Sequence, residues 1–350
     1  MALPLLEPFN NTHLISPNSL FIAAEGFEAR SLTWMSSLPQ KKIFQKSIIL
    51  TYLPKRESKL NVLLPLTETR SKSNVEVLEF NRFEPQVAET YLRKEISKWL
   101  HGIDEVILDI SVMSKLMIMI LVVLLKDYNF HLRIIYSEPE HYAPTQWEYE
   151  RHKDQLSQCA NLPSWGVHNI VRTSLLTSVV MQGAPAVLIA FTSFNEQLIR
   201  SLLPTINPSV FILINGVPPH LSWREKAMQE IHLFAIKEYA LTNELDKAGR
   251  LINKTSTLFY AETFELLAET YKRYCYSNRV ILAPTGSKLQ AFSCALLKLC
   301  CPDVDIEYPT PESFIFKGYS SEKIRNIHQI KFDNFSSFIV SIAEQYHLNG

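Results

Sequence analysis

Residues Val106–Lys115 read VILDISVMSK and residues Val280–Lys288 read VILAPTGSK, so one apolar run with a Ser-Lys pair occurs twice in the chain. In each copy a polar loop follows the apolar run, and a helical pattern begins at the lysine. This order is typical of one strand–loop–helix element of an α/β protein. The stretch therefore predicts an α/β fold, and its recurrence indicates an internal repeat.

Two further pairs of segments recur in the same order. Residues Ile22–Glu28 resemble Ile189–Asn195, and residues Tyr136–Tyr142 resemble Tyr308–Phe314. The distance along the chain between the two tyrosines differs by one residue from the distance between the two lysines. We therefore predict two tandem Rossmann-like units with mainly parallel sheets, related by a pseudo-two-fold axis.

The alternation of strand and helix patterns along the chain sets the expected boundaries. Continuous apolar strands separated by helices favour a mainly parallel sheet that is covered on both faces. We predict a first Rossmann-like unit at 1–146, a connecting arm at 147–184, a second unit at 185–318, and a small C-terminal strand–helix extension at 319–350. The expected strands are Ser19–Ala24, Ser47–Leu53, Val75–Phe80, Glu105–Ile110, Leu132–Tyr136, Ala186–Phe191, Val210–Asn215, Val280–Ala283, Val304–Tyr308 and His328–Phe332.

Composition limits the possible functions. The 350 residues contain 35 Lys+Arg and 35 Asp+Glu, and this zero net charge argues against broad coating of nucleic acid. The most apolar run, Leu116–Leu125, is too short to cross a bilayer and predicts a helix buried on every side. The N-terminus lacks a signal-peptide pattern, and the five scattered cysteines predict neither disulfides nor a metal site. These features predict a cytoplasmic protein without membrane association.

The loop Pro284–Lys288 is the sharpest candidate for ligand binding. Gly286 permits a tight turn, Thr285 and Ser287 offer hydroxyl groups, and Lys288 adds a positive charge at the start of a helix. This combination suits a phosphate or another anion, although the spacing of a Walker A loop is absent. The alternative is an ordinary helix N-cap with a solvated lysine.

The first copy offers the corresponding residues Ser111, Ser114 and Lys115. With Asp109 before them, and with Thr285, Gly286 and Lys288 in the second copy, this pattern resembles the ligand motif of CRISPR-associated Rossmann-fold (CARF) domains. The resemblance implies a sensor that binds a cyclic oligonucleotide across a two-fold axis, as a component of a defence system. The first copy lacks the glycines of that motif.

Two other sets of polar residues follow predicted strands. Glu140 and Glu312 are matched carboxylates in the repeated loops, suited either to general acid–base chemistry or to helix capping. Glu25, Glu28 and Arg30 follow the first strand, and together with Asp109 they are the best candidates for an asymmetric catalytic centre. Carboxylates at strand ends suit Mg²⁺. A bound Mg²⁺ would be required only if the protein were an enzyme.

Three functions remain open from the sequence. The leading hypothesis is a sensor or regulatory protein that binds a nucleotide or another phosphorylated ligand between the two units and signals to a protein partner. The second is a metal-assisted enzyme acting on nucleotides or nucleic-acid ends, although no complete catalytic signature is present. The third is a structural subunit of a multiprotein assembly, because one architecture hosts many functions.

Overall fold

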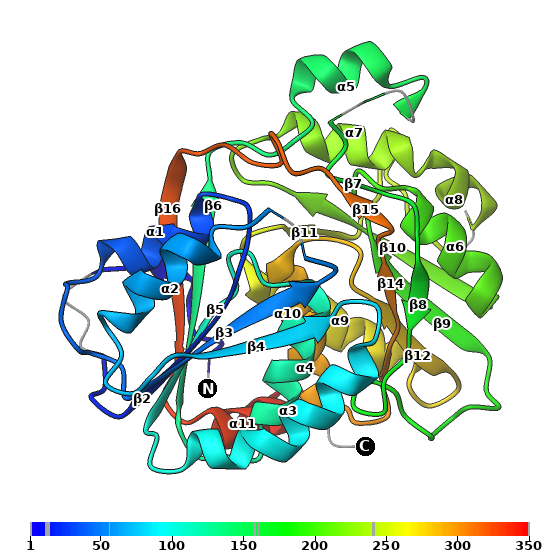
Figure 1. Ribbon diagram of the computed structural model, residues 1–350. Helices are drawn as coiled ribbons and strands as arrows, with labels where there is room; N and C mark the ends of the chain where they lie inside the picture. Colours follow the sequence, from blue (N-terminus) through cyan, green and yellow to red (C-terminus); the bar gives the residue numbers. More distant parts are fainter. Residues whose placement is uncertain are drawn as a thin grey trace. The chain divides into compact units, whose positions relative to one another are not determined.

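The computed structural model describes residues 2–10, 15–55, 57–156, 159, 161–239 and 242–348. In this part of the chain it has a mixed α/β architecture with 11 helices and a large, mainly parallel sheet (Figure 1). The chain forms two compact units. The first contains Met1–Tyr142 and Phe316–Ile342, and the second contains Ala143–Ile315 and Ala343–Gly350.

Five parallel strands form the centre of the first unit's sheet. Their order in space is β6-β5-β2-β3-β4, so the first strand along the chain lies in the middle. All residues of β2 and β5 are buried, as expected for strands covered on both faces. The bounds are β2 Ser19–Ala24, β3 Lys46–Leu53, β4 Glu76–Asn81, β5 Glu105–Asp109 and β6 His131–Pro139.

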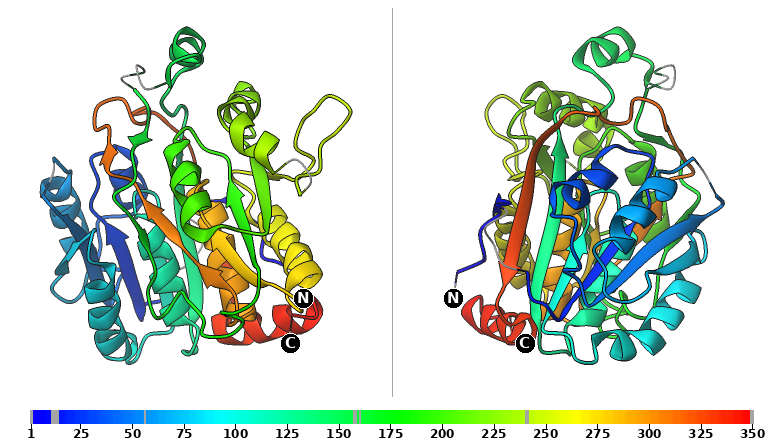
Figure 2. Two further views of the ribbon diagram at one scale, coloured as in Figure 1. Left: turned by 90° about the vertical axis from the view of Figure 1, so that its right-hand side faces the viewer. Right: turned by 60° about the vertical axis from the view of Figure 1, so that its left-hand side comes forward.

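Two antiparallel strands extend this sheet beyond β6. Strand β16 (Ile324–Phe332) pairs with β6, and the short β1 (Glu7–Pro8) pairs with β16. Figure 2 shows β16, in orange-red, beside the green β6. The strand expected at His328–Phe332 is therefore longer than predicted and is part of the seven-stranded sheet.

Four helices cover the first sheet. Helices α1 (Arg30–Ser37) and α2 (Leu60–Glu68) pack together, as do α3 (Pro85–Leu100) and α4 (Lys115–Leu125) on the other face (Figure 1). Every residue of α4 from Leu116 to Leu125 is buried, which confirms the prediction of a helix enclosed on all sides. Aromatic rings fill the opposite layer, where Trp34 of α1 packs on Phe21 at 5.5 Å between ring centroids.

The second unit contains a five-stranded, fully parallel sheet. Its order in space is β11-β10-β9-β12-β13, and the first strand along the chain again lies in the middle. The bounds are β9 Ala186–Phe191, β10 Val210–Val217, β11 Lys254–Ser256, β12 Arg279–Ala283 and β13 Asp305–Ile306.

The registers of the two sheets agree at their centres. Ile22 of β2 is the Cα partner of Leu108 in β5, and Ile189 of β9 is the partner of Leu282 in β12. These are the residues that the sequence repeat aligns, since Ile22 corresponds to Ile189 and Leu108 to Leu282. The same strand order and register therefore accompany the repeated sequence.

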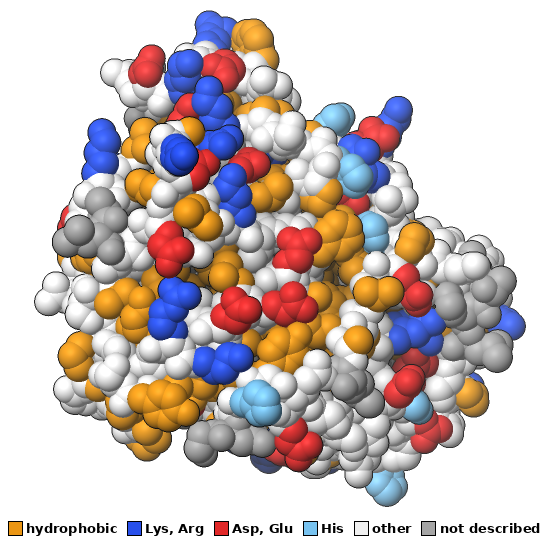
Figure 3. Space-filling view, turned by 180° about the vertical axis from the view of Figure 1, so that it is seen from behind, with side chains coloured by type: hydrophobic (Ala, Val, Ile, Leu, Met, Phe, Trp, Pro, Cys, Tyr) orange, Lys and Arg blue, Asp and Glu red, His pale blue; other side chains and the backbone are white. Residues whose placement is uncertain are grey.

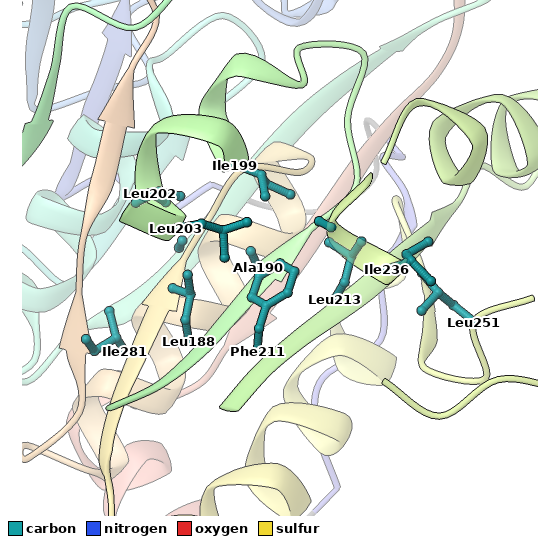
Figure 4. Packing of buried hydrophobic residues seen from close by; sticks show 12 residues of the cluster. Leu188, Ala190, Ile199, Leu202, Leu203, Phe211, Leu213, Ile236, Leu251 and Ile281 are labelled. Atoms are coloured by element: carbon teal, nitrogen blue, oxygen red, sulfur yellow. The ribbon is translucent and has the colours of Figure 1, made fainter. Parts of the chain in front are cut away.

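Helices cover both faces of the second sheet. Helices α6 (Gln197–Ile206) and α8 (Leu233–Glu238) pack on one face, where Leu188, Phe211 and Ile199 belong to a continuous apolar core (Figure 4). Helices α9 (Tyr260–Tyr274) and α10 (Lys288–Cys300) pack together on the other face. Every residue of α10 from Leu289 to Cys300 is buried, whereas α9 keeps one exposed side, as an amphipathic helix does.

The remaining elements are short or peripheral. The predicted connecting arm, of which residues 157, 158 and 160 lie outside the described part, contains helix α5 and two short strands. Each of these strands pairs with a strand that follows β13. The bounds are α5 Gln146–His152, β7 Ser164–Trp165, β8 Asn169–Val171, β14 Tyr308–Thr310, β15 Ser313–Phe314, α7 Trp223–Ile231 and the C-terminal α11 Phe335–Gln345.

The surface matches the balanced composition. On the face shown in Figure 3, acidic and basic side chains are interspersed with hydrophobic ones. Among the described residues, no helix combines the length and the apolar character needed to span a bilayer.

Candidate functional site

All candidate residues except Glu312, which lies between β14 and β15, lie at or after the carboxyl ends of parallel strands. Among the parallel strands of each sheet, the central strand is the first along the chain, and later strands are added first on one side of it and then on the other. The change of side falls between β2 and β5 in the first unit and between β9 and β12 in the second. Loops diverge at such a point, and ligands of open α/β sheets bind there. We call the loops after β2 and β5 the first-sheet edge, and the loops after β9 and β12 the second-sheet edge.

A glycine brings two loops together at the first-sheet edge. A Cβ atom on Gly26, after β2, would lie 2.8 Å from Cβ of Val112, after β5. The carbonyl of Gly26 also accepts a hydrogen bond of 2.9 Å from the amide of Lys59, just before α2. The loops at this edge are therefore in direct contact, and a larger residue at position 26 would separate them.

Glu28 and Arg30 form a buried ion pair at this edge. The Nε and Nη2 atoms of Arg30 donate to the two carboxylate oxygens of Glu28 at 2.8 and 2.9 Å. Nη1 of Arg30 donates to the hydroxyl of Tyr142 at 3.2 Å, and the hydroxyl of Ser320 donates to Glu28 at 2.6 Å. We call Glu28, Arg30, Tyr136, Tyr142 and Ser320 the arginine cluster.

Protonation states in the arginine cluster follow from burial and charge. Burial is the largest single influence on Arg30 and would lower its pKa, but the Glu28 carboxylate and the two tyrosines together raise that pKa well above its ordinary value. Burial raises the pKa of Tyr136 and Tyr142, whose hydroxyl oxygens lie 2.5 Å apart. The cluster therefore holds one guanidinium, one carboxylate and two neutral phenols, and its polar groups bond to one another.

The other acidic candidates of this edge also have partners within the protein. The carboxylate of Glu25 accepts from the amide of Tyr52 at 3.1 Å and from the hydroxyl of Ser58 at 2.7 Å. Asp109 is buried and accepts from the amide of Ser111 at 2.9 Å. Within the described ranges, no group of three His, Cys, Asp or Glu side chains is arranged to hold a metal ion.

The predicted phosphate residues of the first copy lie at the start of α4. The hydroxyl of Ser111 accepts from the amide of Ser137 at 2.8 Å. Ser114 is the N-cap, and its hydroxyl accepts from the amide of Met117 at 3.2 Å. Lys115 is the first helical residue and is half-buried.

In the second-sheet edge, Thr285 and Gly286 join two strands. The Thr285 hydroxyl donates to the carbonyl of Phe191 at 2.5 Å and accepts from its amide at 2.9 Å, so the last residue of β9 is linked to the loop after β12. A Cβ on Gly286 would lie 2.8 Å from Cβ of Phe191 and 2.1 Å from Oε1 of Gln290. Thr285 thus uses its hydroxyl within the protein, and position 286 has room only for glycine.

Ser287 and Lys288 begin α10, as Ser114 and Lys115 begin α4. The Ser287 hydroxyl accepts from the amide of Gln290 at 3.1 Å, and the Gln290 side chain accepts from the amide of Ser287 at 2.8 Å. This reciprocal capping box fixes the first turn of α10. Lys288 is the first residue of the helix and is half-buried.

Several buried polar residues of this edge were not among the predicted site residues. Gln290 donates from Nε2 to the hydroxyl of Thr255 at 3.1 Å. The Thr192 hydroxyl donates to Oδ1 of Asn215 at 2.8 Å and accepts from the amide of Gly216 at 3.0 Å. The Ser-x-x-Gln spacing is a capping-box signature that identifies Gln290, whereas nothing local to the sequence pairs Thr192 with Asn215.

Glu140 and Glu312 lie in different units. The carbonyl of Glu140 accepts from Nη2 of Arg325 at 3.3 Å, and its amide donates to the carbonyl of Lys323 at 3.0 Å. Glu312 is exposed, and its carboxylate lies beside Gly166, where a Cβ would come within 2.6 Å of Oε2. Backbone hydrogen bonds fix the loop around Glu140, whereas the Glu312 side chain is exposed beside Gly166.

Comparisons with protein-family models and with curated proteins found no match for the chain.

Proposed function

We propose that the chain consists of two Rossmann-like units that arose by duplication and are related by pseudo-symmetry. The proposal is supported by the shared strand order, in which the first strand is central and the fourth lies beside it. It is also supported by the register, because the repeated isoleucines, Ile22 and Ile189, pair with the repeated leucines, Leu108 and Leu282. Duplication accounts for both features at once.

We further propose that the protein is a cytosolic regulatory protein that binds a nucleotide or another phosphorylated ligand at these strand ends and signals to a protein partner. One observation carries the proposal: Ser-Lys begins the helix after the fourth strand in both sheets, as Ser114-Lys115 and Ser287-Lys288. A cation at the first turn of a helix opposes the helix dipole. Its recurrence at the switch point therefore indicates a role other than helix stability, and holding an anion is the chemistry that this place favours.

The second-sheet edge is the better candidate for the phosphate. Gly286 lets the loop lie close against β9, and the capping box holds the first turn of α10 in one conformation. The capping box already uses the amides of Ser287 and Gln290, so an anion here would be held by the Lys288 ammonium group beside a first turn that needs no further ordering. The resemblance to CARF domains favours a cyclic oligonucleotide as the phosphorylated ligand.

Native mass spectrometry of the purified protein, followed by nucleotide analysis of anything released on denaturation, tests the proposal. We expect an added mass that disappears on denaturation and corresponds to a phosphorylated compound. If the mass is that of the bare chain, a panel of nucleotides is titrated while the melting temperature is measured. Failure of both measurements contradicts the proposal.

Lysine variants locate the ligand once one is found. Lys288→Ala and Lys115→Ala each remove a charge at a helix start, so we expect about tenfold weaker binding, equivalent to about 1.4 kcal/mol. Lys272→Ala in the last turn of α9 is the matched control and should bind normally. Unchanged affinity in both variants would exclude the proposed anion site.

A structural-subunit role is the second candidate, and a specific observation favours it. The polar groups of the arginine cluster and the Thr285 hydroxyl make hydrogen bonds within the protein. Such internal bonds make the loops rigid, as expected of a structural subunit that binds no ligand at these places. Recovery of the protein in a defined complex without any bound nucleotide would support this candidate over the sensor.

A further inference from the structure

Strand β4 forms an open edge of the first sheet. It pairs with β3 on one side, and within the described residues no strand pairs with its other side (Figure 1). Edge strands of this length present unpaired backbone groups and are usually shielded in monomeric proteins. The six residues of β4 contain two glutamates and neither lysine nor proline.

The register with β3 shows which backbone groups point outward. Arg82 donates its amide to the carbonyl of Leu53 at 3.2 Å, so the backbone groups of Arg82, and of alternate residues before it, face β3. Successive backbone groups of a strand point to opposite sides. The amides and carbonyls of Val77 and Glu79 therefore face away from the sheet.

Apolar side chains accompany this edge. Val77 is 42% exposed, and on the neighbouring α3 Val87 is 64% and Tyr91 39% exposed. Tyr91 packs on Phe80 of β4 with ring centroids 5.8 Å apart, which fixes α3 beside the strand. Because side chains alternate along a strand, Val77 lies on the face opposite to Phe80 and α3, so apolar area flanks the outward backbone groups on both faces of this edge.

We propose that β4 pairs antiparallel with β4 of a second copy of this chain, about a two-fold axis that passes midway between Leu78 of one copy and Leu78 of the other. In this register Val77 lies opposite Glu79 of the other copy, and their outward amides and carbonyls bond to one another. A two-fold interface must be complementary to itself, and this register meets that requirement. A register centred on Glu79 is disfavoured, because it would place that carboxylate directly opposite itself.

Charges also fit this arrangement. Diagonal neighbours across the pair bring Glu76 of one copy close to Arg82 of the other, and the contact occurs twice by symmetry. Glu76 is exposed, and the guanidinium of Arg82 is held over the ring of Phe83 at 4.3 Å. Lys55 lies 3.2 Å from the Glu79 carboxylate within each copy and reduces the repulsion between the two Glu79 side chains. The exposed Val87 and Tyr91 of the two α3 helices would then cover each other.

Sedimentation velocity of the full chain over a wide concentration range tests this inference. We expect wild-type protein with twice the mass of the chain. Val77→Pro removes an outward amide without touching the ladder to β3, so it should be monomeric with an unchanged circular dichroism spectrum. Val179→Lys, at an exposed loop of the second unit, is the control and should remain dimeric.

A charge exchange provides a second test that does not depend on proline. Glu76→Arg and Arg82→Glu should each weaken the dimer about tenfold, because each makes both diagonal contacts repulsive. An equimolar mixture of the two variants should restore the dimer, since every diagonal contact is then between opposite charges. Wild-type protein that stays monomeric at the highest accessible concentration, or a mixture that does not reassociate, would overturn the inference.

Discussion

The two sheets have the same strand order, but different types of side chain hold the loop after the central strand of each sheet. At the first-sheet edge, Glu28 and Arg30 form a buried ion pair that also binds Ser320. At the corresponding place of the second-sheet edge stand Asn195 and Gln197, and Asn195 donates to the hydroxyl of Ser164 at 3.2 Å. In both units this position therefore ties the loop after the central strand to a segment that is distant in the sequence.

The difference shows that either charged or neutral side chains can hold the loop after the central strand against a distant segment. A buried ion pair depends on both partners, because the loss of one leaves an unpaired charge. A neutral amide makes weaker hydrogen bonds, and its loss costs less. The two edges should therefore respond very differently to matched substitutions, and the following experiments are ordered from the largest expected effect to the smallest.

Arg30→Met should be the most destabilising substitution. It leaves the Glu28 carboxylate buried without its guanidinium, and breaking a buried pair in this way costs about 3–5 kcal/mol. The free energy of unfolding, measured with urea, gives the cost directly. Gln197→Met at the matching place of the second unit is the control and should change it by less than about 0.5 kcal/mol.

The double variant Glu28→Gln/Arg30→Met tests whether the stranded Glu28 charge causes the loss of stability. Removing the stranded charge should recover part of the lost stability, since the remaining amide can be buried at lower cost. If Arg30→Met were no less stable than Gln197→Met, the arginine cluster would not be the structural tie described here.

The second unit contains a buried histidine, His232, that should make the stability of the protein depend on pH. His232 in the second unit is fully buried, and Nδ1–H donates to the carbonyl of Met228 at 2.8 Å. Burial lowers the pKa of His232 to about 4, below the value of about 6.5 expected in the unfolded chain. The unfolded state thus binds more protons between these values, so stability is lost as the pH falls through this window.

We expect wild-type protein to lose about 2 kcal/mol between about pH 7 and pH 5 from this group alone. His232→Asn keeps a donor for Met228 and cannot titrate, so that part of the pH dependence should vanish. Urea unfolding of both proteins at the two pH values measures the difference. An identical pH dependence would show that His232 is accessible to protons in the folded state.

Gly286→Ala tests how tightly the second-sheet edge is packed. The new methyl group would meet Cβ of Phe191, which cannot move away without shifting β9. We expect a loss of about 1.5 kcal/mol, within the usual range for an added methyl group in a packed interior. Gly183→Ala is the control, since nothing lies within 4 Å of its Cβ position. Equal melting temperatures of the two variants would contradict the close approach of the loop to β9.

Local patterns in the sequence predicted most of the elements but not their partners. Continuous apolar runs identified the central strands, and the Ser-Lys pairs identified the starts of α4 and α10. Helix α2 was missed because Pro65 lies inside it, and proline usually ends a helical pattern. Strands of two or three residues, such as β7 and β15, are too short to show any periodicity.

The contacts of the candidate residues could not be predicted, because they join distant parts of the chain. Ser320 is 292 residues from Glu28, and Tyr142 is 112 residues from Arg30. A single sequence carries no sign of such pairs, so Glu28 and Arg30 were predicted as catalytic candidates from their place after a strand. In the folded chain the side chains of Glu28 and Arg30 form an ion pair with each other.

The smallest expected effect comes from making the second edge resemble the first at one position. Gln290 is the third residue of α10, and the matching residue of α4 is Met117. Both backbone amides are capped by the preceding serine, but the Gln290 side chain also accepts from the amide of Ser287 and donates to Thr255. Gln290→Met should therefore keep the serine cap and cost about 1 kcal/mol, measured by urea unfolding. Gln146→Met, an exposed change at the start of α5, is the control. If the two variants were equally stable, the capping box would add nothing to the serine cap, and the two edges would differ only in the ion pair.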